Sequence, residues 1–583
     1  MCGLVAILSH KFSHTVNESD LSPIRDFMNS RGRDDHGCFI SDNKKVGLGH
    51  RRMSIIDTSD QGHQPMSSAS NEKIKIIYNG EIYNYLTLRN ELISKGYKFN
   101  SETDTEVILN GYLEWGEKLL NRLEGMFAFV IYDENKNLLF VARDPFGIKP
   151  LYISVNPKNI IIASQVKAIL QSKDVSKERC SEGHVSFFLW GHVSEPYTFY
   201  KSIKAVKAGT FLIINHEGKI IEKEFFNIST YYRDNNFKNE NFALAIGNSV
   251  KKHLVSDVSL GVFLSSGIDS SVVAYHVAKN SKEKIKTLSI GFENFINTDL
   301  DETVLALKTS RQIGSDHKTS FINDDSLKNE MDNFISKMDQ PTTDGFNMWL
   351  ACKEANKMGC KVMLTGLGGD ELFSGYPSFN QIPNLLNNKL VSTLRFLNMG
   401  TILRKISYPI IKSFVPPKYA GIVEYSSSVS NAFLLRRGFY MPWEIQKHLS
   451  LNDIDEALSN VLCDYEMQAK EFQDLSINLQ IKILEQTKYM KDKLLKDMDW
   501  IGYEHEIELR TPLLDLNILN FSMGCSKTDL FNTTSDLPIE ILRRSKTGFA
   551  TPSKIYSREN KKSNRRKTTR AWHSEVYEKY LSI

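Results

Sequence analysis

The stretch Phe263-Leu264-Ser265-Ser266-Gly267-Ile268-Asp269-Ser270-Ser271 indicates the fold of the larger part of this chain. An apolar strand at 261–264 ends in small hydroxylated residues and a glycine, and a helical pattern follows at 270–279. The alternation continues with a strand at 287–291, a helix at 303–313 and a strand at 361–364. We therefore expect an α/β fold with a parallel sheet and a ligand site at its carboxyl edge.

The turn after the first of these strands has the features of a phosphate-binding loop. Backbone N–H groups that are exposed at a helix N-terminus bind phosphate. Asp269 would repel bare phosphate, so Mg²⁺ is expected between the two. The alternative is a serine-rich helix cap with an aspartate in the first turn, which is common in proteins.

Two further glycine-containing runs support a nucleotide site. The run Leu364-Thr365-Gly366-Leu367-Gly368-Gly369-Asp370-Glu371 again joins a strand, a turn and an acidic pair. The run Lys546-Thr547-Gly548-Phe549 places a lysine beside a glycine turn, where it could neutralise charge that develops on phosphates. The alternative for Lys546 is a solvated surface lysine.

The N-terminus offers a candidate nucleophile in Met1-Cys2-Gly3. Removal of Met1 would leave Cys2 with a thiol and a free α-amine, whose ordinary pKa values are about 8.5 and about 8. The amine could then accept the thiol proton and act as a built-in general base. The alternative is a small residue at the start of a strand.

Three clusters in the first 227 residues could serve this thiol. Asn79 and Gly80 offer a side-chain amide and a backbone N–H, which an oxyanion hole needs. One of the two arginines Arg51 and Arg52 could hold a substrate carboxylate through two hydrogen bonds, and Asp104 could pair with a substrate amine. A turn, a surface arginine and a helix cap are the respective alternatives. Together these features predict a site for an amino acid with a side-chain amide, with glutamine as the leading candidate.

Composition narrows the class of protein. The chain has 583 residues, of which 41% are hydrophobic and 24% charged, and its net charge is +4. This length predicts two domains, and the small charge gives no reason to expect nucleic acid or a membrane as the main partner. The seven scattered cysteines predict reduced thiols in a cytoplasmic protein. Neither a membrane span nor a secretory signal is expected.

The first part of the chain resembles the class II glutamine amidotransferases, which are N-terminal-nucleophile hydrolases. The resemblance rests on runs at Met1-Cys2-Gly3, Arg31-Gly32-Arg33-Asp34-Asp35, Arg52-Met53-Ser54-Ile55-Ile56-Asp57, Asn79-Gly80-Glu81-Ile82-Tyr83-Asn84, Gly125-Met126-Phe127-Ala128-Phe129 and Arg143-Asp144-Pro145-Phe146-Gly147. It implies an αββα sandwich in which Cys2 is the nucleophile. It further implies that Asn79 and Gly80 form the oxyanion hole and, with Arg52, Glu81 and Asp104, hold glutamine.

The second part resembles the PP-loop synthetase domain of the asparagine synthetase family. The resemblance implies a Rossmann-like parallel sheet that binds ATP and Mg²⁺, with Asp269 and Asp370 on the metal and Lys546 acting in catalysis. Ser266 stands where the family's loop has a glycine. The implied ATP-binding residues are Leu264, Ser265, Ser266, Gly267, Asp269, Ser270, Ile290, Thr365 and Gly366.

The resemblance implies a two-domain enzyme, and the acceptor is its open question. Glutamine would release ammonia at Cys2, and the ammonia would attack a carboxylate that ATP has adenylated. Aspartate is the acceptor expected from the family. The alternative is a tailoring enzyme that acts on a sugar acid of a surface polysaccharide or on another carboxylate, because Leu367 replaces the family's usual glutamate. A catalytically silent scaffold is a third possibility, which the retained Cys2 and Lys546 argue against. A homodimer is the assembly considered.

The predicted boundaries are a first domain at 2–227, a synthetase domain at 240–552 and a tail at 553–583. The polar stretch 227–241 is interpreted as a linker. The tail is basic, and we expect it to be solvated and to lie outside the resemblance.

Overall fold

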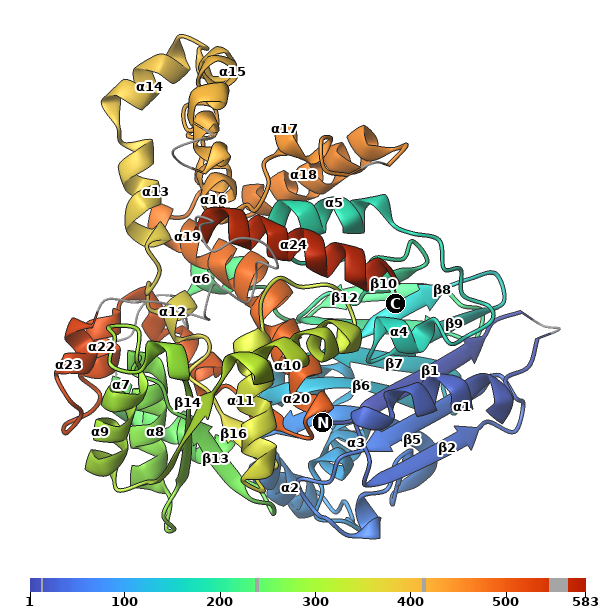
Figure 1. The fold of residues 1–583 in the computed structure, drawn as a ribbon. Coiled ribbons are helices and arrows are strands. Elements are labelled where there is room, and N and C mark those ends of the chain that lie inside the picture. The colour runs from blue at the N-terminus through green and yellow to red at the C-terminus, as the bar shows by residue number, and fades with distance from the viewer. Residues whose placement is uncertain (12–13, 236–240, 412–415, 450, 545–564, 583) are drawn as a thin grey trace.

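The computed structural model describes residues 1–11, 14–235, 241–411, 416–449, 451–544 and 565–582 (Figure 1). The N-terminal domain contains two six-stranded antiparallel sheets. The first has the order β10 (Ile203–Ala205), β8 (Tyr152–Val155), β9 (Asn159–Ala163), β1 (Gly3–Ser9), β3 (Val46–Arg52), β2 (Asp35–Ile40). The second has the order β12 (Ile220–Glu224), β11 (Thr210–Asn215), β7 (Leu138–Arg143), β6 (Gly125–Asp133), β5 (Asn71–Ile82), β4 (Met66–Ser68).

Alternation of apolar side chains along each strand explains why the two sheets stack. Leu4, Ala6 and Leu8 of β1 join the core between the sheets, whereas Val5 and Ile7 pack in a second core with helix α1. The outer faces are covered by α1 (Glu18–Phe27) and α4 (Val166–Ile169) on one side and by α2 (Tyr85–Ser94) and α3 (Asp104–Trp115) on the other. This is the αββα sandwich that the resemblance implies.

The second domain contains a five-stranded parallel sheet. Its order is β15 (Asp316–Ile322), β14 (Lys286–Phe292), β13 (Leu260–Phe263), β16 (Val362–Leu364), β17 (Glu508–Arg510). Val262 of β13 pairs with Thr287 on one side and with Leu364 on the other, so the chain order reverses direction at β13. Ligands bind at such a switch point in parallel sheets. The helices around this sheet are α7 (Phe242–His253), α8 (Ile268–Asn280), α9 (Thr303–Ile313), α10 (Asp324–Lys337) and α11 (Phe346–Lys357).

Beyond β16 the domain is largely helical (Figure 1). A π-helical segment at Glu485–Leu495 leads directly into α20 (Lys496–Glu504), which packs against the N-terminal domain. No helix among the described residues is long and apolar enough to span a membrane. The remaining helices are α5 (Ser181–Trp190), α12 (Gly369–Leu372), α13 (Ser378–Leu386), α14 (Lys389–Phe396), α15 (Gly400–Ile411), α16 (Val429–Arg437), α17 (Pro442–Ile445), α18 (Ile454–Lys470), α19 (Ile477–Leu484), α21 (Leu516–Leu519), α22 (Lys527–Phe531) and α23 (Glu540–Arg543).

The prediction of a solvated tail is wrong for its C-terminal part. Residues Arg565–Ser582 form helix α24, which lies beside α5 (Figure 1). Trp572 and Val576 are buried, and the His184 ring of α5 bonds to Tyr577 at 2.8 Å. Trp572 and Val576 are four positions apart and therefore lie on one face of the helix. Burial of this apolar face stabilises the helix against α5 despite the basic residues at its start.

The predicted linker also contains an ordered element. Helix α6 (Ile228–Asp234) begins at Asn227, whose side chain caps the first turn. Tyr232 of this helix is buried and bonds to Ser522 at 2.9 Å. Part of the supposed linker is therefore packed against the synthetase domain.

Candidate active sites

Cys2 lies at the start of β1 beside Asn79 of β5. The Cys2 backbone N–H donates to Asn79 Oδ1 at 3.0 Å, and the Cys2 thiol donates to the Met53 carbonyl at 3.9 Å. Asn79 is fully buried, and its Nδ2 has no hydrogen-bond partner in the part of the chain that the structure describes. A buried donor without an acceptor is costly, so this nitrogen is available to a ligand oxygen next to the thiol, and its role in an oxyanion hole stays a prediction.

Met1 is present in the structure and fills space beside this site. Its side chain is buried, and its α-amine contacts the Met53 sulfur at 2.6 Å. Because Met1 is attached, the Cys2 nitrogen is a peptide amide and has no free lone pair to accept a proton. Burial raises the pKa of the Cys2 thiol, only partly opposed by the nearby α-ammonium. An active Cys2 therefore requires removal of Met1.

The neighbouring residues of β5 are held tightly. A Cβ atom on Gly80 would lie 2.1 Å from the Met126 carbonyl, so only glycine allows this approach of β5 to β6. Asp104 begins α3 and accepts hydrogen bonds from the Tyr78 hydroxyl and the Ile82 N–H, each at 2.9 Å. Burial raises the pKa of Asp104 to about 6.

Two predicted glutamine-binding residues contact other parts of the protein. Glu81 is buried and forms an ion pair at 3.3 Å with Arg510 of the synthetase domain. Arg52 donates to the carbonyls of Ser59 at 2.9 Å and Ile56 at 3.2 Å, which fixes the loop after β3. The structure thus brings Cys2 and Asn79 together, while the glutamine contacts of Arg52, Glu81 and Asp104 stay predictions.

The predicted ATP-binding residues converge on one cavity of about 500 Å³ at the carboxyl edge of the parallel sheet. The loop before α8 is organised by its own hydroxyl groups, because Ser270 Oγ accepts from the Ser265 N–H at 3.1 Å and Ser265 Oγ accepts from the Gly267 N–H at 3.1 Å. Ser266 is buried. The lining residues include all nine of the prediction: Leu264, Ser265, Ser266, Gly267, Asp269, Ser270, Ile290, Thr365 and Gly366.

The two predicted metal ligands lie side by side in this cavity. Lys527 Nζ forms ion pairs with Asp269 and, at 2.9 Å, with Asp370. No cluster of three or more metal-binding side chains occurs among the described residues. Two carboxylates still fit Mg²⁺, which binds one or two carboxylates and completes its shell with phosphate oxygens and water.

Lys527 and Arg544 line the cavity as well, and neither was predicted from the sequence. Lys527 belongs to Ser526-Lys527-Thr528-Asp529, where Ser526 and Asp529 form a helix-capping box. The local pattern indicates only a helix start, and no signal marks the lysine as a site residue. The predicted Lys546 lies outside the described residues.

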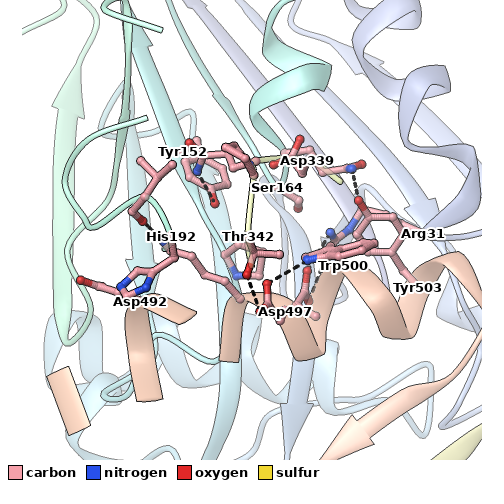
Figure 2. A pocket seen from close by; sticks show the side chains of 17 residues that line it. Arg31, Tyr152, Ser164, His192, Asp339, Thr342, Asp492, Asp497, Trp500 and Tyr503 are labelled. Atoms are coloured by element: carbon pink, nitrogen blue, oxygen red, sulfur yellow. Dashed lines mark hydrogen bonds and ion pairs between the residues drawn. The ribbon is translucent and has the colours of Figure 1, made fainter. Parts of the chain in front are cut away.

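A small cavity of about 30 Å³ lies between the domains (Figure 2). Tyr152, Ser164 and His192 line it from the N-terminal domain, and Thr342 and Asp497 line it from the synthetase domain. Its volume suits one or two molecules of the size of water or ammonia.

Asp497 connects this cavity with the ATP cavity, because it lines both. It accepts hydrogen bonds from Thr342 Oγ1 at 2.8 Å and from Trp500 Nε1 at 3.1 Å (Figure 2). Burial, and after it the negative charge of Asp344, raises the pKa of Asp497 to about 7. A carboxyl group with a pKa near the working pH is suited to proton transfer.

Comparisons with known proteins agree with this two-part architecture. A family model of the glutamine amidotransferase domain matches residues 1–226, and a model of asparagine synthase matches residues 241–581. The chain belongs to the asparagine synthase family and carries a glutamine amidotransferase domain at its N-terminus. The second match includes α24, so the expectation that the tail lies outside the resemblance is wrong.

Three relatives show how the likeness is distributed. Glutamine-hydrolysing asparagine synthetase 1 of Bacillus subtilis (strain 168) is 31% identical, with coverage of 95% of this chain and 87% of its own length. Asparagine synthetase 3 of the same organism is 31% identical over 65% of this chain and 64% of its own length. Amidase chry2 of Gibberella zeae is 29% identical over 65% of this chain and 60% of its own length. Relatives that are named asparagine synthetase and amidase thus lie at similar identity to this chain.

Proposed function

We propose that this protein transfers the amide nitrogen of glutamine to a carboxylate that ATP activates. The observation that carries the proposal is the position of Asp497, which lines both the cavity between the domains and the cavity that the predicted ATP-binding residues surround. These two cavities thereby share a buried carboxyl group, and Arg31, which lines the cavity between the domains, donates to the Cys2 carbonyl at 2.8 Å. We expect ammonia that is released at Cys2 to pass through the cavity between the domains to the ATP cavity.

In the first half-reaction the Cys2 thiolate attacks the side-chain carbonyl of glutamine. A carbon–sulfur bond forms, the carbonyl oxygen becomes an oxyanion beside Asn79 Nδ2, and ammonia leaves with the proton that the Cys2 amine supplies. Water then hydrolyses the thioester and releases glutamate.

In the second half-reaction an oxygen of the acceptor carboxylate attacks the α-phosphorus of ATP, and pyrophosphate leaves. Mg²⁺ held by Asp269 and Asp370 would neutralise phosphate charge, and Lys527, which lines the ATP cavity, would add positive charge near the phosphates. Lys546 is expected from the family to do the same. Ammonia then attacks the acyl carbon, the bond to AMP breaks, and Asp497 accepts the proton that the nitrogen loses.

The test supplies ATP, Mg²⁺ and glutamine with a panel of carboxylic acids and follows glutamate and pyrophosphate. The proposal requires glutaminase activity and acceptor-dependent pyrophosphate release in the same preparation. Aspartate, expected from the family, and sugar acids are separated by which of them stimulates pyrophosphate release. Pyrophosphate release that never depends on an added carboxylate would contradict the proposal.

A further inference from the structure

A second cavity, of about 300 Å³, lies next to the ATP cavity. Its cations come from α16 and from the π-helical segment, and its aromatic rings surround them. The cations are Arg436, Arg437, Lys488 and Lys493. We call this space the cationic cavity. Its volume falls within the range typical of pockets for small organic ligands.

The cationic cavity adjoins both of the other cavities. Lys493, which lines it, forms an ion pair at 3.4 Å with Asp344, which lines the ATP cavity. Gly375 lines the ATP cavity, and the next residue, Tyr376, lines the cationic cavity. His192 is shared with the cavity between the domains. A molecule bound here would therefore lie near both the nucleotide and the route of ammonia.

The charges in the cationic cavity favour an anion. No aspartate or glutamate is among the described residues that line it. Arg437 is neutralised by a bidentate ion pair with Glu485, with distances of 3.1 and 2.6 Å, and Lys493 by its ion pair with Asp344. Among the described residues this leaves Lys488 and Arg436 without an acidic partner. Lys488 is buried, and burial lowers its pKa to about 8. Ligand oxygens that accept hydrogen bonds from this ammonium group would offset the cost of burying it.

The same charges disfavour aspartate. An amino acid carries an α-ammonium group, which needs a carboxylate or several carbonyl groups as partners, and these cations would repel it. A sugar acid has a carboxylate and hydroxyl groups but no ammonium. Its ring also offers apolar C–H faces that can pack on Tyr376, Tyr489 and Trp190, which line the cavity.

We propose that the cationic cavity is the acceptor site and that the acceptor is a uronic acid, whose carboxylate points toward Lys493 and the nucleotide. This inference rests on the proposed function, because it assigns the acceptor of the same reaction. Lys488 and Arg436 bind the acceptor, and the aromatic rings select a sugar over a smaller amino acid.

The experiment uses the full-length protein with ATP, Mg²⁺ and ammonium chloride, and D-glucuronate, D-galacturonate and L-aspartate as acceptors. We expect pyrophosphate release with a uronate and background release with aspartate. The variants Lys488→Met and Arg436→Gln should raise KM for the uronate by tenfold or more, the effect of losing one charge-assisted hydrogen bond. KM for ATP and the glutaminase rate should stay within about twofold of the parent.

Lys482→Met is the matched control. Lys482 is also buried with a pKa lowered by burial to about 8, but it bonds to the Ser522 carbonyl away from the cationic cavity. Its loss should leave KM for the uronate unchanged. Arg436 is only half-buried and gives a second measurement if Lys488→Met does not fold.

The outcomes separate the two claims. Pyrophosphate release with aspartate but not with a uronate, at a KM for aspartate that neither variant alters, overturns the acceptor assignment. It leaves the proposed function intact. Uronate turnover that is insensitive to both variants overturns the cationic cavity as its site. Glutaminase activity without pyrophosphate release for any acceptor contradicts the proposed function. Calorimetric titration of the protein with D-glucuronate then tests the acceptor site by itself. Absence of binding overturns the inference.

Discussion

Arg31 and Asp499 form a bidentate ion pair across the domain interface, with Nη1–Oδ2 and Nη2–Oδ1 distances of 2.9 and 3.1 Å. Both side chains are buried. The Arg31 Nε donates to the Cys2 carbonyl at 2.8 Å, and the guanidinium stacks on Tyr503. One side chain therefore links the backbone of the candidate nucleophile to α20, the helix that also carries Asp497.

Asp499→Asn should destabilise the protein by about 3–5 kcal/mol, because it leaves the Arg31 guanidinium buried without a counter-charge. We expect the ratio of glutamate to pyrophosphate to rise, since ammonia escapes to solvent where the domains no longer fix one another. Denaturant unfolding and the ratio of glutamate to pyrophosphate measure the two effects. Arg33→Gln, which removes an exposed ion pair with Glu506 across the same interface, should cost no more than about 1 kcal/mol.

Cys2→Ala should abolish glutamine hydrolysis and leave ammonium-driven synthesis intact, because the thiol and the ATP cavity belong to different domains. An alanine inserted between Met1 and Cys2 should have the same effect, since the thiol then lacks its adjacent amine. Glutamate release and the N-terminal mass are the measurements. Glutamine hydrolysis at the parental rate by either variant would falsify the N-terminal nucleophile.

Asn79→Asp retains an oxygen that can accept from the Cys2 N–H but replaces the Nδ2 donor. The glutaminase kcat should fall about 10²–10³-fold, which is the loss expected for one oxyanion-hole donor. KM for glutamine should change much less, and ammonium-driven pyrophosphate release should not change. A fall confined to KM would instead assign Asn79 to substrate binding alone.

Lys546→Ala and Lys527→Met should each lower pyrophosphate release by at least about a hundredfold, the size expected when a preorganised charge near the phosphates is lost. Glutaminase activity should persist. In Lys527→Met the carboxylates of Asp269 and Asp370 lose a shared cation. Added Mg²⁺ should therefore raise the Tm of this variant more than that of the parent, and equal shifts would argue against a metal at this pair.

Asp497→Asn should lower synthesis strongly, and its effect on stability should depend on pH. The folded pKa of Asp497, about 7, lies above the unfolded value of about 3.9, so the folded state binds the proton more tightly. The free energy of unfolding of the parent therefore falls progressively as the pH rises from about 4 to 7. In the variant this term is absent, because asparagine cannot ionise. The Tm of the variant relative to the parent should increase between pH 5 and pH 8. A constant difference would show that Asp497 has an ordinary pKa.

Local sequence determined much of the fold and the residue types of both sites. The apolar runs around Gly261 and Leu364 predicted strands that occur as β13 and β16, and the helix predicted after Ser266 is α8. Cys2, Asn79 and the loop at Ser265–Ser270 were identified because a nucleophile, an oxyanion donor and a phosphate loop each have a short-range chemical pattern. Such patterns depend on neighbours in the chain, so sequence alone reveals them.

Tertiary structure alone decided how these residues meet. Lys527 reaches Asp269 and Asp370 from 150 or more positions away, and Arg31 reaches Asp499 from the other domain. The basic tail ends in a packed helix because its apolar stripe packs against α5, and tertiary structure alone shows that α5 is its partner. The sequence determined what each segment can do chemically. Packing between distant segments determined which charges are buried, which cavities adjoin and which pKa values shift, because these depend on distance in space and on exclusion of water.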